Sequence, residues 1–369
     1  MSRFHCRRGG LERRSRLGRL GPIALLCLLG AGFVATQSVA SSGAGGPLIA
    51  VPKAGQMVST SRFKKNPPWT IGYADSSLSN SWRVFAWQYM QYEASKYPVK
   101  IIHTNANDSI PKQVSDIQNL LSKHVDCLIV SATSDKALNP IISVASKQVP
   151  VVIQERSVTT TDYTSFAALD AVEMGRLQAQ AVANALHGKG NIVILEGVAG
   201  SGPVDQSLEG MHSVLEKYPG IKVLTTQYTN WSAATGKSDM QNDLTAFKRI
   251  DGVLSDSGLQ AQGAFEAVQA AGRLKEIKVW TGDDVQAWLR TVNKYHLPGV
   301  IVDRPTLVAE TSVKDCIAIL QGQSVPKLWQ TVNQVIPAAK ISKYLAPNTP
   351  GSDQWWDWWD LPAKWRPKA

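Results

Sequence analysis

The chain has 369 residues, of which 44% are hydrophobic and 18% are charged, and its formal net charge at pH 7 is +10. This length is enough for two domains of ordinary size, each with its own hydrophobic core. Seven of the basic residues and a single acid, Glu12, lie within residues 1–40, so the charge of the remaining chain falls to about +4. The charge therefore gives no support to a nucleic-acid partner.

Residues 1–40 have the three-part order of a secretory signal peptide. An arginine-rich stretch ends at Arg19, an apolar stretch covers 22–34, and small residues lead to Ala40, so we predict cleavage after Ala40 and a periplasmic location. The apolar stretch is shorter than the roughly 20 residues of a membrane span, although an uncleaved N-terminal anchor is the alternative. Cys27 lacks the small preceding residues of a lipoprotein signal.

Two cysteines follow this segment. Cys127 lies in the apolar run CLIV and Cys316 in the helical pattern VKDCIAIL, and each occupies a place where a small buried hydrophobic residue would serve. An oxidising compartment would permit a disulfide between them, but their spacing does not require one. The sequence contains neither CxxC nor HExxH, so no thiol-rich or zincin-type metal site is indicated and no cofactor is expected.

In chain order, residues 41–68 come first; they are rich in Ser, Gly, Pro and Lys and are predicted to be a flexible leader. From Trp69 on, short apolar runs alternate with amphipathic stretches of helical length, which indicates βαβ units and a parallel sheet. The first predicted strands are 71–74, 99–104, 127–131 and 151–154, and the first predicted helices are 82–96, 110–123 and 137–147. Each strand ends in polar residues, at the edge where open parallel sheets bind ligands.

A second run of the same pattern begins at about Asp170, which is suited to cap a helix over 172–186. The further predicted strands are 192–195, 223–227, 252–255, 278–280 and 300–302, and the further helices are 206–218, 233–247, 260–271, 285–294 and 308–320. A cleft between two such halves is the default binding site. The indoles of the run WWDWWD in the tail, 346–369, either cover an apolar surface of the fold or form a contact patch for a partner.

Five segments carry a resemblance to a known family. They are IGYADSSLSNSWR at 71–83, IQNLLSKHVDCLIVSATSDKALNP at 117–140, PVVIQERS at 150–157, ILEGVAGSG at 194–202 and GAFEAVQAAGR at 263–273. No single segment is decisive. In their joint order and spacing, from Trp69 to about Val335, the sequence resembles the periplasmic sugar-binding proteins of ABC importers, of the ribose- and galactofuranose-binding type within the type I periplasmic binding proteins.

The resemblance implies an α/β fold of two Rossmann-like, doubly wound parallel-sheet lobes joined by a three-strand hinge that closes on a ligand. The implied parts are a signal peptide at 1–40, the leader at 41–68, an N-terminal lobe at 69–169 with 304–328, a C-terminal lobe at 170–303 with 329–345, and the aromatic-rich tail at 346–369. It further implies a monomeric solute-binding component that delivers a monosaccharide or related polyol to an ABC permease in the inner membrane.

Sugar hydroxyls donate and accept hydrogen bonds while the C–H groups of the ring form an apolar face, so planar polar groups and aromatic rings suit a sugar site. The positions of this kind that match the family's ligand contacts are Asn80, Trp82, Arg83, Glu155, Arg156, Trp231 and Asp283. The resemblance implies that Trp231 stacks on the sugar and that Asp283 accepts hydroxyl protons. The alternative roles are core packing for the tryptophans, a solvated ion pair for Glu155 and Arg156, and a cap for Asp283.

Three places depart from the family's pattern. Ser207, preceded by Asp205, stands where the family often has Arg, Ser257 replaces a common Asn, and Asp303 replaces the hinge Gln of ribose binders. We include these four residues among the expected ligand contacts. The site would then lose one Arg and gain carboxylates, which predicts poor binding of ribose itself and leaves a pentose, a furanose, a polyol or an amino-bearing sugar open.

Other functions have less support in the sequence. None of the six histidines accompanies a nucleophile-elbow motif, and GVAGSG lacks the pattern of a phosphate-binding loop, so an enzyme is not indicated. A regulator of the lactose-repressor type would need a helix-turn-helix module where this chain has an export signal. A ligand-sensing co-receptor for chemotaxis or for a sensor kinase is the alternative to transport, because both functions use the same closed lobes.

Overall fold

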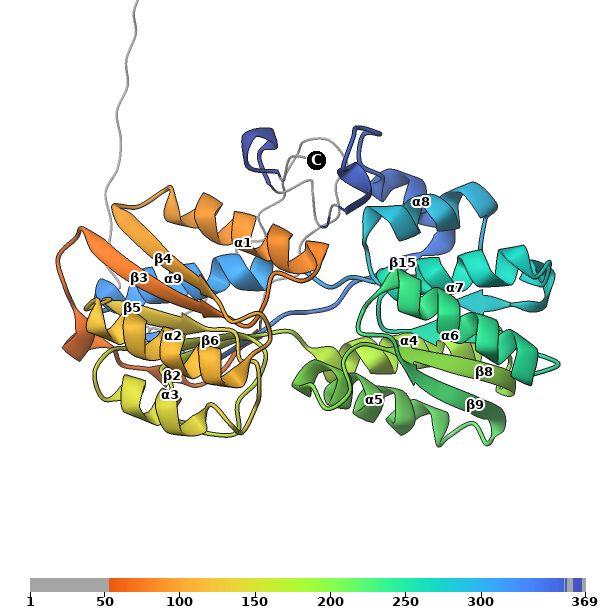
Figure 1. Ribbon diagram of the computed structural model, residues 1–369, viewed down its shortest axis with the longest axis horizontal. Helices are drawn as coiled ribbons and strands as arrows, with labels where there is room; N and C mark the ends of the chain where they lie inside the picture. Colours follow the sequence, from red (N-terminus) through yellow and green to blue (C-terminus); the bar gives the residue numbers. More distant parts are fainter. Residues whose placement is uncertain (1–52, 355, 357–360, 367–369) are drawn as a thin grey trace, which may run out of the picture. The chain divides into compact units, whose positions relative to one another are not determined.

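The computed structural model describes residues 53–354, 356 and 361–366, and these contain two parallel sheets with helices packed on them (Figure 1). The mixed α/β class with parallel sheets predicted from the sequence is confirmed. The predicted signal peptide and the first part of the predicted leader lie outside the described residues. Among the described helices, none combines the length and the apolar character needed to cross a membrane.

The first sheet has the strand order β1-β14-β7-β6-β5-β3-β4, in which β1 is antiparallel to its neighbour and the other pairs are parallel. Its strands are β1 Lys53–Ala54, β3 Trp69–Asp75, β4 Val99–Asn105, β5 Cys127–Val130, β6 Val151–Glu155, β7 Ser165–Ala168 and β14 Leu328–Gln330. With helices α1 Ser81–Ala94, α2 Ile110–Ser122, α3 Asn139–Ser146 and α9 Leu307–Leu320, it forms the first lobe. The inner strand β5 is buried along its whole length, as expected for a strand covered on both faces.

The second sheet has the parallel order β11-β10-β8-β9. Its strands are β8 Lys189–Glu196, β9 Gly220–Tyr228, β10 Gly252–Ser255 and β11 Val279–Trp280; with α4 Ala171–Ala185, α5 Gly202–Leu215, α6 Ala233–Ala246, α7 Gly258–Ala270 and α8 Gln286–Tyr295 they form the second lobe. The pairs α4–α5 and α6–α7 pack closely. A Cβ atom at Gly210 would lie 1.9 Å from the carbonyl oxygen of Val172, and one at Gly263 would lie 1.9 Å from that of Ala233, so only glycine permits these contacts.

Two short antiparallel pairs lie outside the two main sheets. β12 (Val300–Val302) pairs with β15 (Val335–Pro337), and β13 (Val325–Pro326) pairs with β2 (Met57–Val58). Because β14 belongs to the first sheet and β15 pairs with β12, the chain passes from the one to the other at 331–334. The strands β7, β13, β14 and β15 were not predicted from the sequence.

The residues from 53 to 68 differ from the flexible leader that the sequence predicts. The strand β1 pairs with β14, and β2 pairs with β13. Thr60 is fully buried, and the backbone N–H of Lys65 donates to the carbonyl of Leu320 at 2.8 Å. This part of the chain is held by backbone hydrogen bonds to strands and a helix near the other end of the sequence, which composition does not reveal.

A disulfide joins Cys127 on β5 to Cys316 on α9, with 5.9 Å between the two Cα atoms. Both residues are fully buried, which confirms the prediction that they occupy places for small hydrophobic side chains. They are 189 residues apart in sequence, and they meet because α9 returns from the second lobe to pack on β5. The sequence permits this bond without requiring it.

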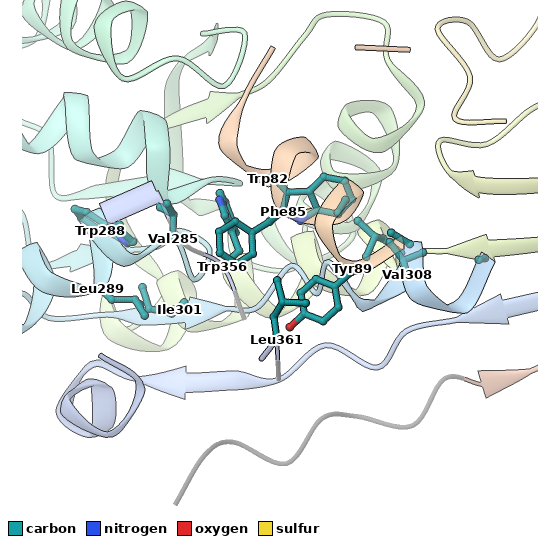
Figure 2. Close-up of a cluster of buried hydrophobic side chains, with 14 of the residues drawn as sticks. Trp82, Phe85, Tyr89, Val285, Trp288, Leu289, Ile301, Val308, Trp356 and Leu361 are labelled. Atoms are coloured by element: carbon teal, nitrogen blue, oxygen red, sulfur yellow. The ribbon is translucent and has the colours of Figure 1, made fainter. Parts of the chain in front are cut away.

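One hydrophobic cluster includes part of the aromatic tail (Figure 2). Trp356 and Leu361 are 1% and 0% exposed and lie with Trp82 of α1 and Trp288 of α8 in the same cluster. For Trp356, the first of the two expected roles of the tail, covering an apolar surface of the fold, is therefore confirmed. The other indoles of the run WWDWWD lie outside the described residues.

Candidate ligand-binding site

A cavity lies where polar and aromatic residues from both lobes meet. Its lining consists of residues at or after the carboxyl ends of strands and one residue of the tail: Asn80, Trp82, Arg83, Glu155, Trp231, Ser257, Leu259, Asp283, Arg304 and Trp356. Seven of these ten are residues that the sequence predicts as ligand contacts. Their convergence follows from the parallel sheets, since the carboxyl ends of parallel strands share one edge.

The first turn of α1 positions two lining residues. The side-chain oxygen of Asn80 caps the helix by accepting from the backbone N–H of Arg83 at 3.1 Å. Trp82 is only 5% exposed, and its indole N–H donates to the carbonyl of Arg304 at 2.8 Å. Trp82 is therefore both a core residue and a wall of the cavity, and it connects the first lobe to the segment after β12.

Arg83 is held in place by the residues around its guanidinium group. Its Nη2 donates to Glu155 Oε2 at 2.7 Å, its Nη1 donates to Ser131 Oγ at 3.1 Å, and the same Nη1 lies 3.5 Å from Asp75 Oδ1. Burial disfavours the charged guanidinium, but the carboxylates of Glu155 and Asp75 outweigh burial and raise the pKa of Arg83. The result is a fixed cation at the cavity wall that stays ionised.

Two lining residues have unusual backbone geometry. Glu155 has φ of 60° and Trp231 has φ of 52°, both in the left-handed region that residues with side chains rarely adopt. Each comes at or shortly after the end of a strand, β6 for Glu155 and β9 for Trp231. Strained conformations of this kind persist where the surrounding structure enforces them, and they concentrate at functional sites.

Arg156 lies beside this cluster but outside the cavity lining. Its Nε is 3.7 Å from Glu155 Oε2 and its Nη1 is 3.8 Å from Asp108 Oδ1. Burial, together with the positive charge of Arg83, lowers the pKa of Arg156 to about 10. The predicted acid–arginine pair is present, and its acid is bound more closely by Arg83 than by Arg156.

The indole of Trp231 rests directly on the backbone of Gly197, which follows β8. A Cβ atom on Gly197 would lie 1.9 Å from Trp231 Cε2, so the position accepts no side chain. The indole N–H donates to Asp256 Oδ2 at 2.8 Å, and the guanidinium carbon of Arg304 lies 5.9 Å from the ring centre. Trp231 is thus held with one face against the chain and its N–H already bound.

Asp256, which the sequence did not suggest, connects several of these groups. Its Oδ2 accepts from Trp231 and, at 3.0 Å, from Arg304 Nη2, while its Oδ1 accepts from Gln260 Nε2 at 2.6 Å. Burial raises the pKa of Asp256, partly offset by the charge of Arg304. Glu196 lies close by, and burial and the charge of Asp256 raise its pKa well above the usual value. Asp256 positions Trp231 and Arg304 from behind the cavity wall.

Asp283 lines the cavity and also binds the start of a helix. Its Oδ1 accepts from the backbone N–H of Gly258 at the start of α7, at 2.6 Å. Its Oδ2 is buried, has no hydrogen-bond donor, and lies 3.5 Å from Arg304 Nε. Burial, reinforced by the neighbouring Asp284, raises the pKa of Asp283 well above the usual value. Because Asp283 lines the cavity, this oxygen is suited to accept a hydrogen bond from a ligand hydroxyl.

Arg304 is a lining residue that sequence reasoning missed. It is 6% exposed, and its backbone N–H donates to Asp284 Oδ1 at 3.0 Å. It supplies a second guanidinium group to a site that was expected to have lost an arginine. The pair Asp303–Arg304 directly after the apolar strand β12 is the signal that could have revealed it, since polar residues at such strand ends are binding candidates.

Three other predicted contacts do not line the cavity. Asp205 is exposed and lies in the first turn of α5, and the buried Ser207 donates to Glu196 Oε1 at 3.1 Å. Asp303 accepts from the backbone N–H of Gln334 at the crossing between the lobes. The helix α5 begins at Gly202, earlier than the predicted start at 206, so Asp205 also lies in the helix and not in the loop before it. Direct ligand contact by these residues, and by Arg156, stays a prediction.

Ser257 and Leu259 complete the lining at the start of α7. The Ser257 side chain caps this helix by accepting from the backbone N–H of Leu259 at 3.3 Å. Within the described residues, no group of three or more His, Cys, Asp or Glu side chains is arranged to hold a metal ion. The lining therefore offers aromatic faces, guanidinium donors and carboxylate acceptors, a set that suits a polyhydroxylated molecule.

Known proteins are similar to this chain over most of the two lobes. A family model described as a periplasmic binding protein domain matches residues 71–324. The chain is 30% identical over 230 residues to the xylitol-binding protein of Mycolicibacterium smegmatis, an alignment that spans 62% of this chain and 65% of that relative, slightly less than two thirds of its length. It is 28% identical over 260 residues to the ribose import binding protein of Bacillus subtilis, covering 70% of this chain and 84% of that protein.

Solved structures show the same fold. The fructose-binding periplasmic domain of a hybrid two-component system has a TM-score of 0.69 and 28% sequence identity to this chain, and the alignment covers 74% of this chain and 92% of that domain. The resemblance inferred from the ordered sequence segments is confirmed. Because the family model spans most of the two lobes, the chain belongs to the periplasmic binding protein family.

Proposed function

We propose that this protein is the solute-binding component of an ABC importer and that it captures a small polyhydroxylated ligand, a monosaccharide or related polyol, in the cavity between its lobes. The observation that carries the proposal is the composition of the cavity wall, where the rings of Trp82 and Trp231 line the same space as the polar groups of Arg83, Asp283 and Arg304. Such a protein acts as a monomer without a catalytic role and delivers its ligand to a membrane permease.

The chemistry of the wall supports a sugar or polyol. Arg83 and Arg304 are ionised donors, and Asp283 has an oxygen without a hydrogen-bond donor, so hydroxyl groups of a ligand can be bound in both directions. Charged partners roughly double the strength of a hydrogen bond, and the surrounding indoles exclude water. The lining comes from both lobes, so ligand contacts would favour a closed arrangement through hinge motion.

The relatives support transport and also support the alternative. The names of the xylitol-binding and ribose import binding proteins describe small polyhydroxylated ligands, and the second describes import. The fructose-binding neighbour belongs to a two-component system, which favours a ligand-sensing co-receptor as the second candidate. Removing the gene would abolish growth on the ligand as sole carbon source if the function is import, whereas loss of an induced response with uptake intact would indicate sensing.

Export of the chain is part of the proposal. We propose that residues 1–40 are a signal peptide cleaved after Ala40 and that the mature protein is periplasmic. The disulfide between Cys127 and Cys316 supports this location, because disulfides persist in oxidising compartments. Mass spectrometry of the protein recovered from the cell envelope would give the new N-terminus.

The main test is a binding screen of the mature chain from Ser41 on against monosaccharides, alditols, inositols and nucleosides, by thermal shift and then by calorimetry. A ligand at a hundredfold excess over its dissociation constant stabilises the folded state by about 2.7 kcal/mol. We expect one sugar or polyol to give such a shift. Trp231→Ala and Asp283→Asn should each weaken its binding by about tenfold or more, since each removes a contact made in the cavity.

Matched substitutions outside the cavity serve as controls. Trp87→Ala removes an indole from α1, where Trp87 stacks on His103, and Asp116→Asn neutralises a partly buried carboxylate on α2 that pairs with Lys112. Both should leave the affinity unchanged. Equal losses in the controls and in the cavity variants, or a wild-type protein that binds nothing in the panel, would contradict the proposed function.

A further inference from the structure

The C-terminal segment 346–366 lies outside the part of the chain that the family model matches, which ends at residue 324. Where it is described, this segment contacts both lobes beside the cavity. Figure 2 shows Trp356 and Leu361 of the segment among the side chains of α1 and near Val285 and Trp288. The segment is therefore a structural feature added to the two lobes, at the place where the ligand is proposed to bind.

On the second lobe, the segment is held by polar contacts from α8. Gln286 accepts from the backbone N–H of Ala346 at 2.6 Å, and Arg290 Nη2 donates to Ser352 Oγ at 2.8 Å. Arg290 also forms an ion pair with Asp353. These contacts involve both the backbone and the side chains of the segment, so its start has a defined position on α8.

On the first lobe, the segment contacts α1. The indole N–H of Trp356 donates to Ser81 Oγ, in the first turn of that helix, at 3.0 Å. Further along, the ring of Trp365 lies 6.1 Å from the ring of Tyr92. Between these contacts and those on α8, Trp356 is 1% exposed and lines the cavity with Trp82 and Trp231.

The N–H groups of the three lining indoles are all bound by the protein itself. Trp82 donates to the carbonyl of Arg304, Trp231 to the carboxylate of Asp256, and Trp356 to the hydroxyl of Ser81. An indole N–H has a single proton to donate, so these groups have none left for a ligand. What the three side chains offer is therefore their ring surfaces, which contact C–H groups rather than hydroxyls.

We infer that Trp356 is a specificity-determining ligand contact, and that its ring is an apolar wall that selects ring-form sugars or cyclitols with a C–H face over acyclic alditols. This inference rests on the proposed function. A cyclic ligand presents a continuous apolar face that an aromatic ring covers, whereas an alditol must first lose chain freedom to present one. The hydroxyl pattern is left to the arginines and carboxylates of the cavity, so Trp356 discriminates by shape.

The test compares Trp356→Ala and Trp356→Phe with the wild-type mature chain by calorimetry, using the tightest-binding cyclic compound and a panel of alditols that includes xylitol. Trp356→Ala should weaken binding of the cyclic compound by about tenfold or more and binding of an alditol by about threefold or less. Trp356→Phe keeps an aromatic face and should stay within about threefold of wild type for both. Circular dichroism and the unfolding midpoint without ligand establish that each variant is folded.

Trp365→Ala is the matched control, because it removes an indole from the same segment that packs on Tyr92 and does not line the cavity. Its affinities should equal those of wild type. If Trp365→Ala loses as much affinity as Trp356→Ala, the segment acts through its seating on α1 and the inference is overturned. Should Trp356→Ala not fold, an unchanged cyclic-to-alditol ratio in a Trp356→Leu variant, which lacks the aromatic face, would overturn it.

The outcomes separate this inference from the proposed function. Suppose that the wild-type protein binds a sugar, that Trp231→Ala weakens this binding, and that the Trp356 variants leave it unchanged. In that case only the role inferred for Trp356 is wrong. If the wild-type protein binds no compound in the panel, the proposed function falls and the inference falls with it. An equal loss for cyclic compounds and alditols in Trp356→Ala would leave Trp356 a ligand contact but overturn its role in selectivity.

Discussion

At the scale of single residues, the cavity depends on positions that tolerate one kind of side chain. Glu155 and Trp231 hold left-handed backbone conformations, and the indole of Trp231 lies against Gly197. Gly197 itself is not among the residues with positive φ. Glycine is needed at this position because the indole lies against it, and not because of the backbone conformation. A methyl group there must displace Trp231, because a Cβ atom would lie 1.9 Å from the ring.

We therefore predict that Gly197→Ala weakens ligand binding by about tenfold or more, since it moves an aromatic wall of the cavity. Calorimetry with the ligand identified in the screen measures the loss. In a Trp231→Ala background the same substitution should have little further effect, because the side chain that it displaces is already absent. Additive losses in the double variant would mean that Gly197 acts through something other than Trp231.

At the scale of elements, the position of α9 in the fold cannot be predicted from its neighbours in the sequence. It follows the second lobe in sequence but packs on β5, β6 and β7 of the first sheet, where Cys316 forms a disulfide with Cys127. The bond closes a loop of 189 residues, which constrains the unfolded chain strongly in the entropic account of disulfide stabilisation. Neither cysteine lines the cavity, so the bond contributes to stability rather than to ligand contact.

Reduction of this disulfide should lower the free energy of unfolding by about 2–5 kcal/mol and leave ligand affinity unchanged. Urea unfolding of the wild-type protein with and without a reductant measures the difference while all side chains stay the same. A Cys127→Ala/Cys316→Ala variant should show no response to reductant. A wild-type protein whose unfolding midpoint does not respond to full reduction, verified by thiol labelling, would contradict this account.

At the scale of the whole molecule, the lobes are joined through residues near the crossings. Arg304, on the segment after β12, accepts a hydrogen bond from Trp82 of the first lobe at its carbonyl and donates to Asp256 of the second lobe through its guanidinium. The crossing from β14 to β15 contributes Asn333, whose side chain donates to the carbonyl of Asp303. The cavity and the connections between the lobes therefore share residues, which suits a site that responds to hinge motion.

The pH dependence of folding also belongs to this scale, because stability is a property of the whole chain. Asp315 on α9 is 3% exposed, and burial raises its pKa to about 7 even though Ser165 donates a hydrogen bond to it. The folded state thus holds a proton that the unfolded chain, with an ordinary aspartate pKa of about 3.9, releases at lower pH. The stability associated with this proton is complete below about pH 4 and is lost as pH rises towards about 7.

Asp315→Asn removes this titration. We predict that the stability of the variant rises relative to that of wild type as the pH increases. The difference in their free energies of unfolding should change by up to about 4 kcal/mol between about pH 4 and about pH 8. Urea titrations of both proteins at several pH values measure the difference, in which the titrations of all other groups cancel. A difference that does not change with pH would show that Asp315 does not hold its proton in the folded state.

The sequence by itself determined the class of the fold and most of the cavity wall. Alternating apolar runs and amphipathic stretches are local properties, so they revealed the parallel strands β3 to β6 and β8 to β11 and the helices between them. Site residues such as Arg83, Trp231 and Asp283 were named through the resemblance to the periplasmic binding proteins, which the order and spacing of the sequence segments carried. That they meet at one edge follows from parallel pairing.

Only the tertiary structure decided which distant parts of the chain meet. The pairing of β2 with β13, the disulfide from β5 to α9, and the entry of Arg304 and Trp356 into the cavity all join segments far apart in sequence. No local period records such contacts, because a side chain has the same sequence neighbours whether it ends in a cavity or on the surface. Asp205 does not line the cavity for the same reason. Its position depends on how the first turn of α5, which begins at Gly202, is placed relative to the cavity.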